Sequence, residues 1–224
     1  MTIAQKEFYG RRQGRALKKH KAELMAELLP KRLIVIDENG NLSDDFLSIL
    51  KQNQKVQLEI GFGNGEHLAA LALRNPDCLF IGCEPFRNGI ANLLALMERD
   101  NIENIYIFNE DARLLLRALP DNCIDQIYVL FADPWPKARH AKRRFISENT
   151  LSLMQRIMKD KAILQTASDH PIMIEWLKEQ FSLCKFFKTI YQGYEEPLDW
   201  IETKYQRKAV KEGRQCFFMN CISI

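Results

Sequence analysis

Short apolar runs alternate along most of the chain with segments in which apolar residues recur at helical spacing. The apolar runs predict strands at 56–60, 78–83, 104–108, 124–131 and 162–166, with two late strands at 186–191 and 215–222. The helical segments lie at 18–29, 66–74, 88–99, 112–118, 147–158 and 172–181. Strands alternating with helices predict an α/β fold, in which a mostly parallel, twisted sheet carries helices on both faces.

The composition indicates a folded protein, and the distribution of residues indicates how the chain is divided. The chain has 224 residues, of which 46% are hydrophobic and 27% charged, values that exclude a disordered or low-complexity chain. We expect a basic N-terminal arm with a short helix at 1–32 and a single domain at 33–224. No apolar run approaches the ~18 residues of a transmembrane helix. The polar, basic start is not that of a secretory signal, so we expect a cytoplasmic protein without membrane contact.

The net charge of +3 hides an uneven distribution. Residues 1–32 hold nine basic and three acidic side chains, and 204–224 hold five and one. Residues 137–144 hold five cations and no acid, whereas 33–136 hold seven basic and sixteen acidic side chains. Concentrated lysine and arginine attract polyanions, so three basic stretches on an acidic body predict a nucleic-acid partner.

Cysteines and histidines show no pattern of metal ligands. Cys78 and Cys83 lie in one predicted strand, where five steps of ~3.3 Å separate them by about 16 Å, too far for one metal ion or one disulfide. The same holds for Cys216 and Cys221. We therefore expect no metal, and thiols that are small buried hydrophobes in a reducing compartment.

A glycine loop follows the first predicted sheet strand, in Glu59-Ile-Gly61-Phe-Gly63-Asn-Gly65. Glycines let the backbone turn sharply and approach a ligand closely, and the next helix offers free amide groups. The spacing is G-x-G-x-G rather than the G-x-G-x-x-G of dinucleotide-dependent oxidoreductases. It suits a nucleoside without a pyrophosphate, for which S-adenosylmethionine is the common case. A tight turn without a ligand is the alternative.

Acidic residues stand at the ends of three further predicted strands. Glu84 is placed to accept hydrogen bonds from ribose hydroxyls, and Asp111 to accept from an adenine amino group or to cap the next helix. Asp133 follows the fourth strand in Asp133-Pro-Trp-Pro, where two prolines fix the backbone. Trp135 is expected to pack or to stack on a base. The cations after it indicate a methyl acceptor that carries phosphates.

These residues lead to a family. Residues 133–144 closely resemble the signature of the bacterial tRNA (guanine-N7-)-methyltransferases, and residues 59–66 are similar to that family's cofactor loop. The likeness extends from the arm at 11–15 to residues 203–206. It implies a Rossmann-like class I S-adenosylmethionine-dependent methyltransferase that methylates nitrogen 7 of a guanine in the variable loop of tRNA.

The resemblance also implies roles for individual residues. Asp133 matches the residue treated as catalytic. Cofactor contacts are implied for Glu59, Gly61, Gly63, Gly65, Glu84, Asp111 and Asp133. Substrate contacts are implied for Lys137, Asp169, Thr203, Lys204, Tyr205 and Gln206. RNA contacts are implied for Arg139, His140, Ala141, Lys142, Arg143 and Arg144.

Two of these positions carry an open question. The family usually has Glu where this chain has Gln206, so the charge at that position is missing. Asp169 precedes His170-Pro171, and Pro171 fits a first helical turn, so Asp169 is also a candidate helix cap.

Three other functions stay open from sequence. A methyltransferase that attacks an exocyclic amino group also uses an Asp/Asn-Pro-Pro-aromatic stretch, but here the second proline follows the aromatic residue. A dinucleotide-dependent oxidoreductase fits the loop spacing and the basic stretches poorly. A non-catalytic RNA-binding module would not need the glycine and acid set. Monomer and homodimer are both open, and nothing demands a protein partner.

Overall fold

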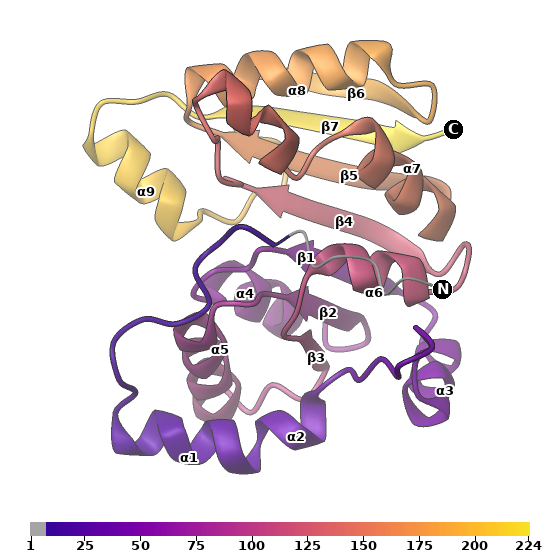
Figure 1. Ribbon diagram of the computed structural model, residues 1–224, viewed down its shortest axis with the longest axis vertical. Coiled ribbons are helices and arrows are strands. Elements are labelled where there is room, and N and C mark those ends of the chain that lie inside the picture. Colours follow the sequence, from indigo (N-terminus) through magenta and orange to yellow (C-terminus); the bar gives the residue numbers. More distant parts are fainter. Residues whose placement is uncertain (1–7) are drawn as a thin grey trace.

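The computed structural model describes residues 8–224 (Figure 1). Within that range seven strands form one sheet in the order β3-β2-β1-β4-β5-β7-β6. Its parallel part is β1 (Val56–Ile60), β2 (Leu79–Cys83), β3 (Ile105–Phe108), β4 (Ile124–Leu130) and β5 (Met158–Ser168). Strand β7 (Phe217–Ser223) runs antiparallel between β5 and β6 (Phe187–Gly193). The α/β fold with a mostly parallel sheet is confirmed.

Helices cover both faces of this sheet (Figure 1). One face packs on α3 (Asp44–Gln52), α6 (Ala112–Ala118), α7 (Glu148–Ile157) and α8 (Pro171–Leu183), whose buried residues share one core cluster. The other packs on α4 (Glu66–Arg74), α5 (Arg87–Arg99) and α9 (Lys204–Lys211). Outside α5 lies α1 (Lys19–Glu27), followed by α2 (Leu29–Arg32). A short 3-10 helix, η1, spans Ala138–Arg143.

The N-terminal helix differs from its prediction. The structure ends α1 at Glu27, and Pro30 lies in the first turn of α2 instead of stopping a helix, since a proline there loses no hydrogen bond. Leu24 and Leu29 are buried in the same core cluster as α4 and α5. The expected boundary at residue 32 therefore marks a change in charge along the chain and does not divide the hydrophobic core.

The chain order 3-2-1-4 puts a reversal between β1 and β4. In open α/β sheets, the loops at such a reversal diverge to opposite faces and leave a crevice beyond the carboxyl ends of the strands. The loops after β1, β2, β3 and β4 therefore meet at one edge, and these loops carry Glu84, Asp111, Asp133 and the three glycines.

Candidate active site

A cavity of about 360 Å³ lies at this edge of the sheet. Its floor includes Gly61 and Gly63 from the loop after β1. Its walls include Glu84, Asp111 and Asp133, so three of the predicted acids come together in one space. The remaining predicted site residues that line it are Gly61, Gly63, Arg143 and Tyr205.

The glycine loop has the conformation that its sequence predicts. Gly61, Gly63 and Gly65 have φ values of 78°, 57° and 77°, in the left-handed region that favours glycine. A Cβ added to Gly65 would lie 2.7 Å from the Leu93 side chain, so this position is closed to other residues for a second reason. The tight loop brings β1 and α4 together under the cavity.

Glu84 is half-buried beside the loop and accepts two backbone hydrogen bonds. Its Oε2 accepts from the Gly63 amide at 2.9 Å, and its Oε1 from the Phe86 amide at 2.9 Å. Burial raises the pKa of Glu84, and the nearby Asp133 and Glu59 carboxylates raise it further, while the two amides oppose the shift. The carboxylate thus holds the glycine loop in place and keeps lone pairs for hydroxyl donors in the cavity.

Asp111 is the N-cap of α6, as its alternative interpretation predicts, and it also lines the cavity. Its carboxylate accepts from the backbone amide of Arg113 at 3.0 Å and from the Arg113 guanidinium at 3.2 Å. Arg113 is itself buried and stacks on Phe145, 5.4 Å from the ring centroid. Capping and ligand binding are therefore compatible at this carboxylate.

Glu59 is placed differently from the other acids. It lines a second, smaller cavity of about 20 Å³, which is adjacent to the first and shares Gly61 and Tyr205 with it. Its Oε2 lies 3.0 Å from Nδ1 of His67, and both side chains are about 5% exposed. The structure thus places Glu59 behind the glycine loop rather than on the wall of the main cavity.

Asp133 lies in a strained stretch of backbone. Phe131 and Trp135, on either side of it, have φ values of 52° and 42°, which are unfavourable for large side chains. The Asp133 side chain is exposed and accepts no hydrogen bond from any residue between 8 and 224. Its carboxylate is therefore open to whatever occupies the cavity.

Arg144 supports that strained stretch from below. Its Nε donates to the Pro134 carbonyl at 3.0 Å and its Nη2 to the Trp135 carbonyl at 3.2 Å. The guanidinium stacks on Trp176 at 4.6 Å and is only 7% exposed. The expected RNA contact of Arg144 does not fit this placement, because both its charge and its donors are already engaged inside the protein.

Arg143, the preceding residue, faces the cavity. Its guanidinium lies between the rings of Tyr9 and Trp135, at 4.8 Å and 5.1 Å from their centroids. Its Nε is buried without a hydrogen-bond partner among the described residues. Trp135 also packs edge-on against His140. Of the two predictions for Trp135, packing is the one that the structure shows.

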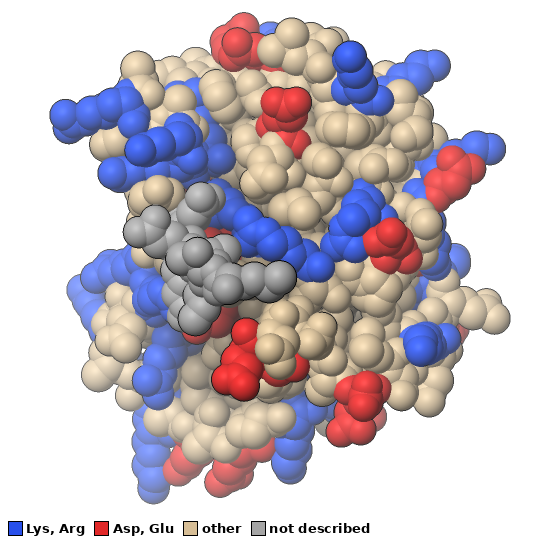
Figure 2. Space-filling view, turned by 45° about the vertical axis from the view of Figure 1, so that its right-hand side comes forward, with Lys and Arg blue, Asp and Glu red and all other residues tan. Residues whose placement is uncertain are grey.

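The other residues of the basic stretch are on the surface. Lys137, Arg139 and Lys142 are exposed and form no salt bridge with any residue between 8 and 224. Burial lowers the pKa of His140, and the surrounding cations lower it further. Figure 2 shows lysine and arginine side chains gathered on one side of this face, above a cluster of acidic ones.

The N-terminal arm is in contact with the site. Phe8, Tyr9, Gly10 and Arg11 line the main cavity. The next residues are fastened at the start of α5, where the Arg12 carbonyl accepts from the Arg87 amide at 2.9 Å. The sequence predicts a basic N-terminal arm. The described part of that arm, from residue 8 onward, lies against the main cavity, and residues 1–7 are outside the described range.

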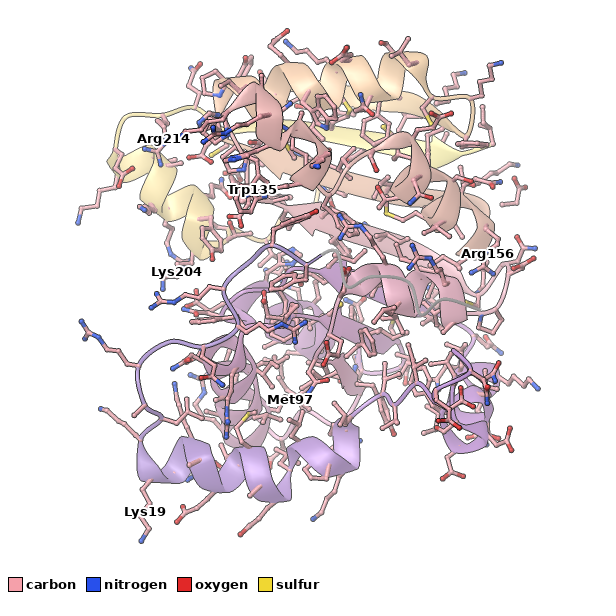
Figure 3. All side chains as sticks on the ribbon, in the orientation of Figure 1. Lys19, Met97, Trp135, Arg156, Lys204 and Arg214 are labelled. Carbon is pink, nitrogen blue, oxygen red and sulfur yellow. The ribbon has the colours of Figure 1, made fainter. Side chains whose placement is uncertain are left out.

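Residues 203–206 begin α9. Thr203 is its N-cap and accepts from the Gln206 amide at 3.1 Å. Tyr205 is half exposed, lines both cavities and stacks on Phe131 at 6.4 Å. Burial raises the pKa of Tyr205, and so do the charges of Glu84 and Asp133. Lys204 is exposed at the rim (Figure 3).

Gln206 points away from the main cavity. Its Oε1 accepts from Trp200 Nε1 at 2.6 Å, and its Nε2 donates to Glu196 Oε1 at 2.6 Å. The side chain is 3% exposed. This amide bridges one donor and one acceptor, a pair that a carboxylate could not serve. The departure from the family pattern thus has a local structural reason, and Gln206 does not reach a base in the main cavity.

Asp169 does not cap α8. The N-cap is His170, whose side chain makes no capping bond, and Asp169 instead accepts from Arg214 Nε at 2.7 Å. The capping interpretation is wrong here. Asp169 is also absent from the walls of the main cavity.

Several site residues had no sequence signal. Tyr9 and Phe8 reach the cavity from far along the chain, so only the tertiary structure reveals them. His67 lies on the helix that follows Glu59, and Arg113 lies on the helix that follows Asp111. Each contacts the preceding acid only because of the way its helix directs its side chain. Gly89 could have been noticed, because a Cβ there would lie 2.0 Å from the Gly63 carbonyl oxygen; glycine lets α5 touch the cofactor loop.

Comparison with known proteins agrees with this geometry. The family described as "Putative methyltransferase" matches residues 53–219. A tRNA (guanine-N(7)-)-methyltransferase of Paramagnetospirillum magneticum is 42% identical over 216 residues, which cover 95% of this chain and 91% of the relative. This chain belongs to the tRNA (guanine-N7-)-methyltransferase family. The family's enzyme from Zymomonas mobilis is 39% identical, with 94% of this chain and 91% of the relative covered.

Solved structures share the fold at lower identity. The 16S rRNA methyltransferase KamB aligns with a TM-score of 0.59 and 18% identity, over 85% of this chain and 99% of that one. An antibiotic-related methyltransferase aligns with a TM-score of 0.61 and 16% identity, over 85% and 96%. These likenesses confirm the class I methyltransferase fold.

Proposed function

We propose that this chain transfers a methyl group from S-adenosylmethionine to nitrogen 7 of a guanine in tRNA, forming 7-methylguanosine. One observation carries the proposal: the free carboxylate of Asp133 lies where the acid-lined cavity opens toward a rim of unpaired cations. Family membership at about 40% identity over nearly the whole chain supports the substrate class. The variable loop as the site of methylation rests on the resemblance alone.

The cavity fits the cofactor in kind. Glu84 offers acceptors for ribose hydroxyls, and Asp111 offers one for an adenine amino group. Gly61 and Gly63 leave the floor free of side chains. Glu59 lies behind the glycine loop and supports it there. It could contact a cationic group of the cofactor only through the smaller cavity. When bound, S-adenosylmethionine supplies an electrophilic methyl group on a sulfonium sulfur.

Protein residues would act by position and charge. Nitrogen 7 of guanine has an in-plane lone pair and no proton, so no general base is required. Catalysis then depends on holding the base in line with the methyl group. Asp133 would accept from the imino and amino groups of guanine and stabilise the positive charge that develops on the ring. Tyr205, stacked on Phe131, offers an aromatic wall for the base.

The rim would hold the RNA. We propose that Lys137, Arg139 and Lys142 contact backbone phosphates, since they are exposed and unpaired. A guanine inside folded tRNA would have to leave its stack to enter the cavity. Arg143, whose Nε has no partner in the described residues, is placed to donate to a ligand inside the cavity. Thr203 and Lys204 would position the segment that carries Tyr205.

Setting and assembly remain part of the proposal. We expect the protein to act in the cytoplasm, where its tRNA substrate is found, as a monomer or homodimer. Among residues 8–224, no helix is long and apolar enough to cross a membrane.

The deciding experiment incubates the purified protein with S-adenosylmethionine and unmodified tRNA, then identifies the digested nucleosides by mass spectrometry. We expect 7-methylguanosine, and far less of it with Asp133→Ala. Another methylated nucleoside, such as one with a methylated exocyclic amine, would overturn the target atom and leave the cofactor assignment. No methylation despite measured cofactor binding and tRNA binding would favour the non-catalytic module. Tight binding of a nicotinamide cofactor instead would favour the oxidoreductase.

A further inference from the structure

Helix α9 carries a second set of cations at the site. Its eight residues, Lys204–Lys211, include three lysines and one arginine. Figure 3 shows Lys204 on the same side of the molecule as Trp135, while Arg156 lies at the opposite end of the sheet. Figure 1 shows α9 beside the carboxyl ends of β4 and β5, where the main cavity opens.

The two arginines of this region are already engaged. Arg207 forms salt bridges with Glu66 on α4 and with Glu202 just before α9. Arg214 pairs with Asp169 and Glu212. These four carboxylates therefore serve arginines and fasten α9 to the domain. The arginines are structural cations here.

The three lysines are different. Lys204, Lys208 and Lys211 are exposed, and none pairs with a carboxylate of residues 8–224. Their spacing of four and three residues puts them on one face of the helix. Gln206 and Ala209, which are buried, mark the opposite face. The lysines thus form a stripe along the outward side of α9, which we name the lysine stripe.

The stripe begins at the mouth of the cavity. Its first member, Lys204, lines the smaller cavity and is followed by Tyr205, which lines both. The loop after Asp133 also lines the main cavity, through Trp135 and Arg143, and the basic stretch at 137–142 lies between these two residues along the chain. Two segments with exposed cations therefore adjoin the acid-lined cavity, residues 137–142 and the start of α9.

Resting on the proposed function, we propose that the lysine stripe is a second RNA-backbone contact, which binds tRNA beside the cavity in addition to residues 137–142. A nucleotide whose base enters the cavity has RNA backbone on both sides of it. A protein that holds only one side would let the base tilt, whereas two lines of cations fix the approach. Lysine suits this task, because it contacts a phosphate as a point charge without base preference.

Two variants test the stripe against a matched control. The test variant is Lys208→Gln with Lys211→Gln, which leaves Lys204 beside the cavity untouched. The control is Lys185→Gln with Lys188→Gln, which removes the same charge at the start of β6. Because β6 runs parallel to β5, the start of β6 lies at the amino ends of the strands, opposite to the carboxyl ends where the cavity opens. Both pairs of lysines are exposed.

The measurement is KM for unmodified tRNA and kcat at several salt concentrations, together with the Kd of S-adenosylhomocysteine. For the stripe variant we expect KM at low salt to rise roughly tenfold, and the slope of log KM against log salt to fall by about 1.4–1.8, since each of the two lost phosphate contacts removes about 0.7–0.9. Cofactor affinity and kcat at saturating tRNA stay unchanged, and the control stays at wild-type values.

Two outcomes overturn the inference. If the stripe variant and the control show the same KM and the same salt slope, α9 does not contact RNA. If the stripe variant loses cofactor affinity, its effect is on the site and not on the backbone. A wild-type protein that makes no 7-methylguanosine would instead refute the proposed function; direct tRNA binding by both variants would then still decide whether the stripe holds RNA.

Discussion

The acids on the two sides of the topological reversal are held in opposite ways. After β2 and β3, Glu84 and Asp111 accept hydrogen bonds from backbone amides of the loops and helix start around them, and both are mostly buried. After β4, Asp133 is exposed and unbonded within the described chain, on a backbone with two large residues at positive φ. The carboxylates assigned to cofactor binding also stabilise loops at the cavity. The loop of Asp133, the carboxylate assigned to the chemistry, is stabilised by Arg144 instead.

This difference has a physical reason. A carboxylate that already accepts hydrogen bonds from backbone amides is fixed in place. Such a fixed carboxylate suits recognition of a cofactor, which is the same in every reaction cycle. A carboxylate that must respond to charge developing on a base is more effective when its lone pairs are free and its position is fixed by other groups. The predictions below follow from this division and run from the largest effect to the smallest.

The largest effect is expected for Asp133→Ala. Methyl transfer should fall by about 10²–10³-fold, because the charge on the product ring loses its counterion. The free energy of unfolding should stay within about 0.5 kcal/mol of wild type, since the side chain makes no hydrogen bond in the described structure. Single-turnover methylation and urea unfolding check both. A loss of stability similar to that of a buried residue would contradict the comparison.

The opposite result is expected for Arg144→Ala. Removing its charge-assisted bonds to the Pro134 and Trp135 carbonyls should lower the free energy of unfolding by about 2–3 kcal/mol. Methylation should fall as a consequence, because the strained stretch loses its support. Arg144→Lys serves as the control: it keeps a charge but not the two-pronged donor, so it should recover only part of the loss. Unchanged stability would show that the strain needs no such support.

On the cofactor side, Glu84→Ala should raise the Kd of S-adenosylhomocysteine roughly 10- to 100-fold through two lost acceptors. Titration calorimetry measures this. The raised pKa of Glu84 adds a pH test in the wild-type protein. The ionised form is lost as the pH falls through that raised value, so cofactor affinity should decrease on acidification before an ordinary glutamate would protonate. A pH-independent affinity across that range would remove Glu84 from the ribose contact.

Substitutions of Arg143 and Arg139 distinguish the role of the cavity from that of its rim. Arg143→Ala should weaken cofactor binding roughly three- to tenfold, since it releases Tyr9 and Trp135 from their shared cation. Arg139→Ala, at an exposed position, should leave cofactor affinity unchanged and weaken only tRNA binding. Parallel measurements of both affinities decide. Equal effects on the cofactor would mean that the whole basic stretch is structural.

The smallest effect on function is expected for Gln206→Glu. The new carboxylate would face Glu196 in place of a donated hydrogen bond, which should cost about 1–2 kcal/mol of unfolding free energy at pH 7. Guanine affinity should not improve. Adding Glu196→Gln restores one donor opposite one acceptor and should recover most of the stability in chemical denaturation. A gain in tRNA affinity from Gln206→Glu alone would show that the missing charge does serve the substrate.

Local sequence determined most of the fold. The helices 66–74 and 112–118 were predicted at the residues where they occur, because glycine or an acid begins each and apolar positions repeat at helical spacing. The longer helices α3 and α9 were missed, as were the short α2 and the 3-10 helix η1. Helix α3 had a visible signal in its Ser43 cap and in Phe46 and Leu50. Helix α9 had almost none, since only Gln206 and Ala209 on it are buried, and a helix so polar has no apolar stripe.

The sequence by itself also determined the chemistry at the carboxyl edge. Glycines at positive φ and acids at strand ends are local facts, and the parallel sheet brings consecutive strand ends together whatever the details of packing. What only the tertiary structure decided is which of several identical side chains does which work. Arg143 and Arg144 are neighbours in a basic run, yet one enters the cavity and the other is buried under the strained stretch. Their roles depend on partners that are distant along the chain, such as Tyr9 and Trp176, which no local pattern specifies.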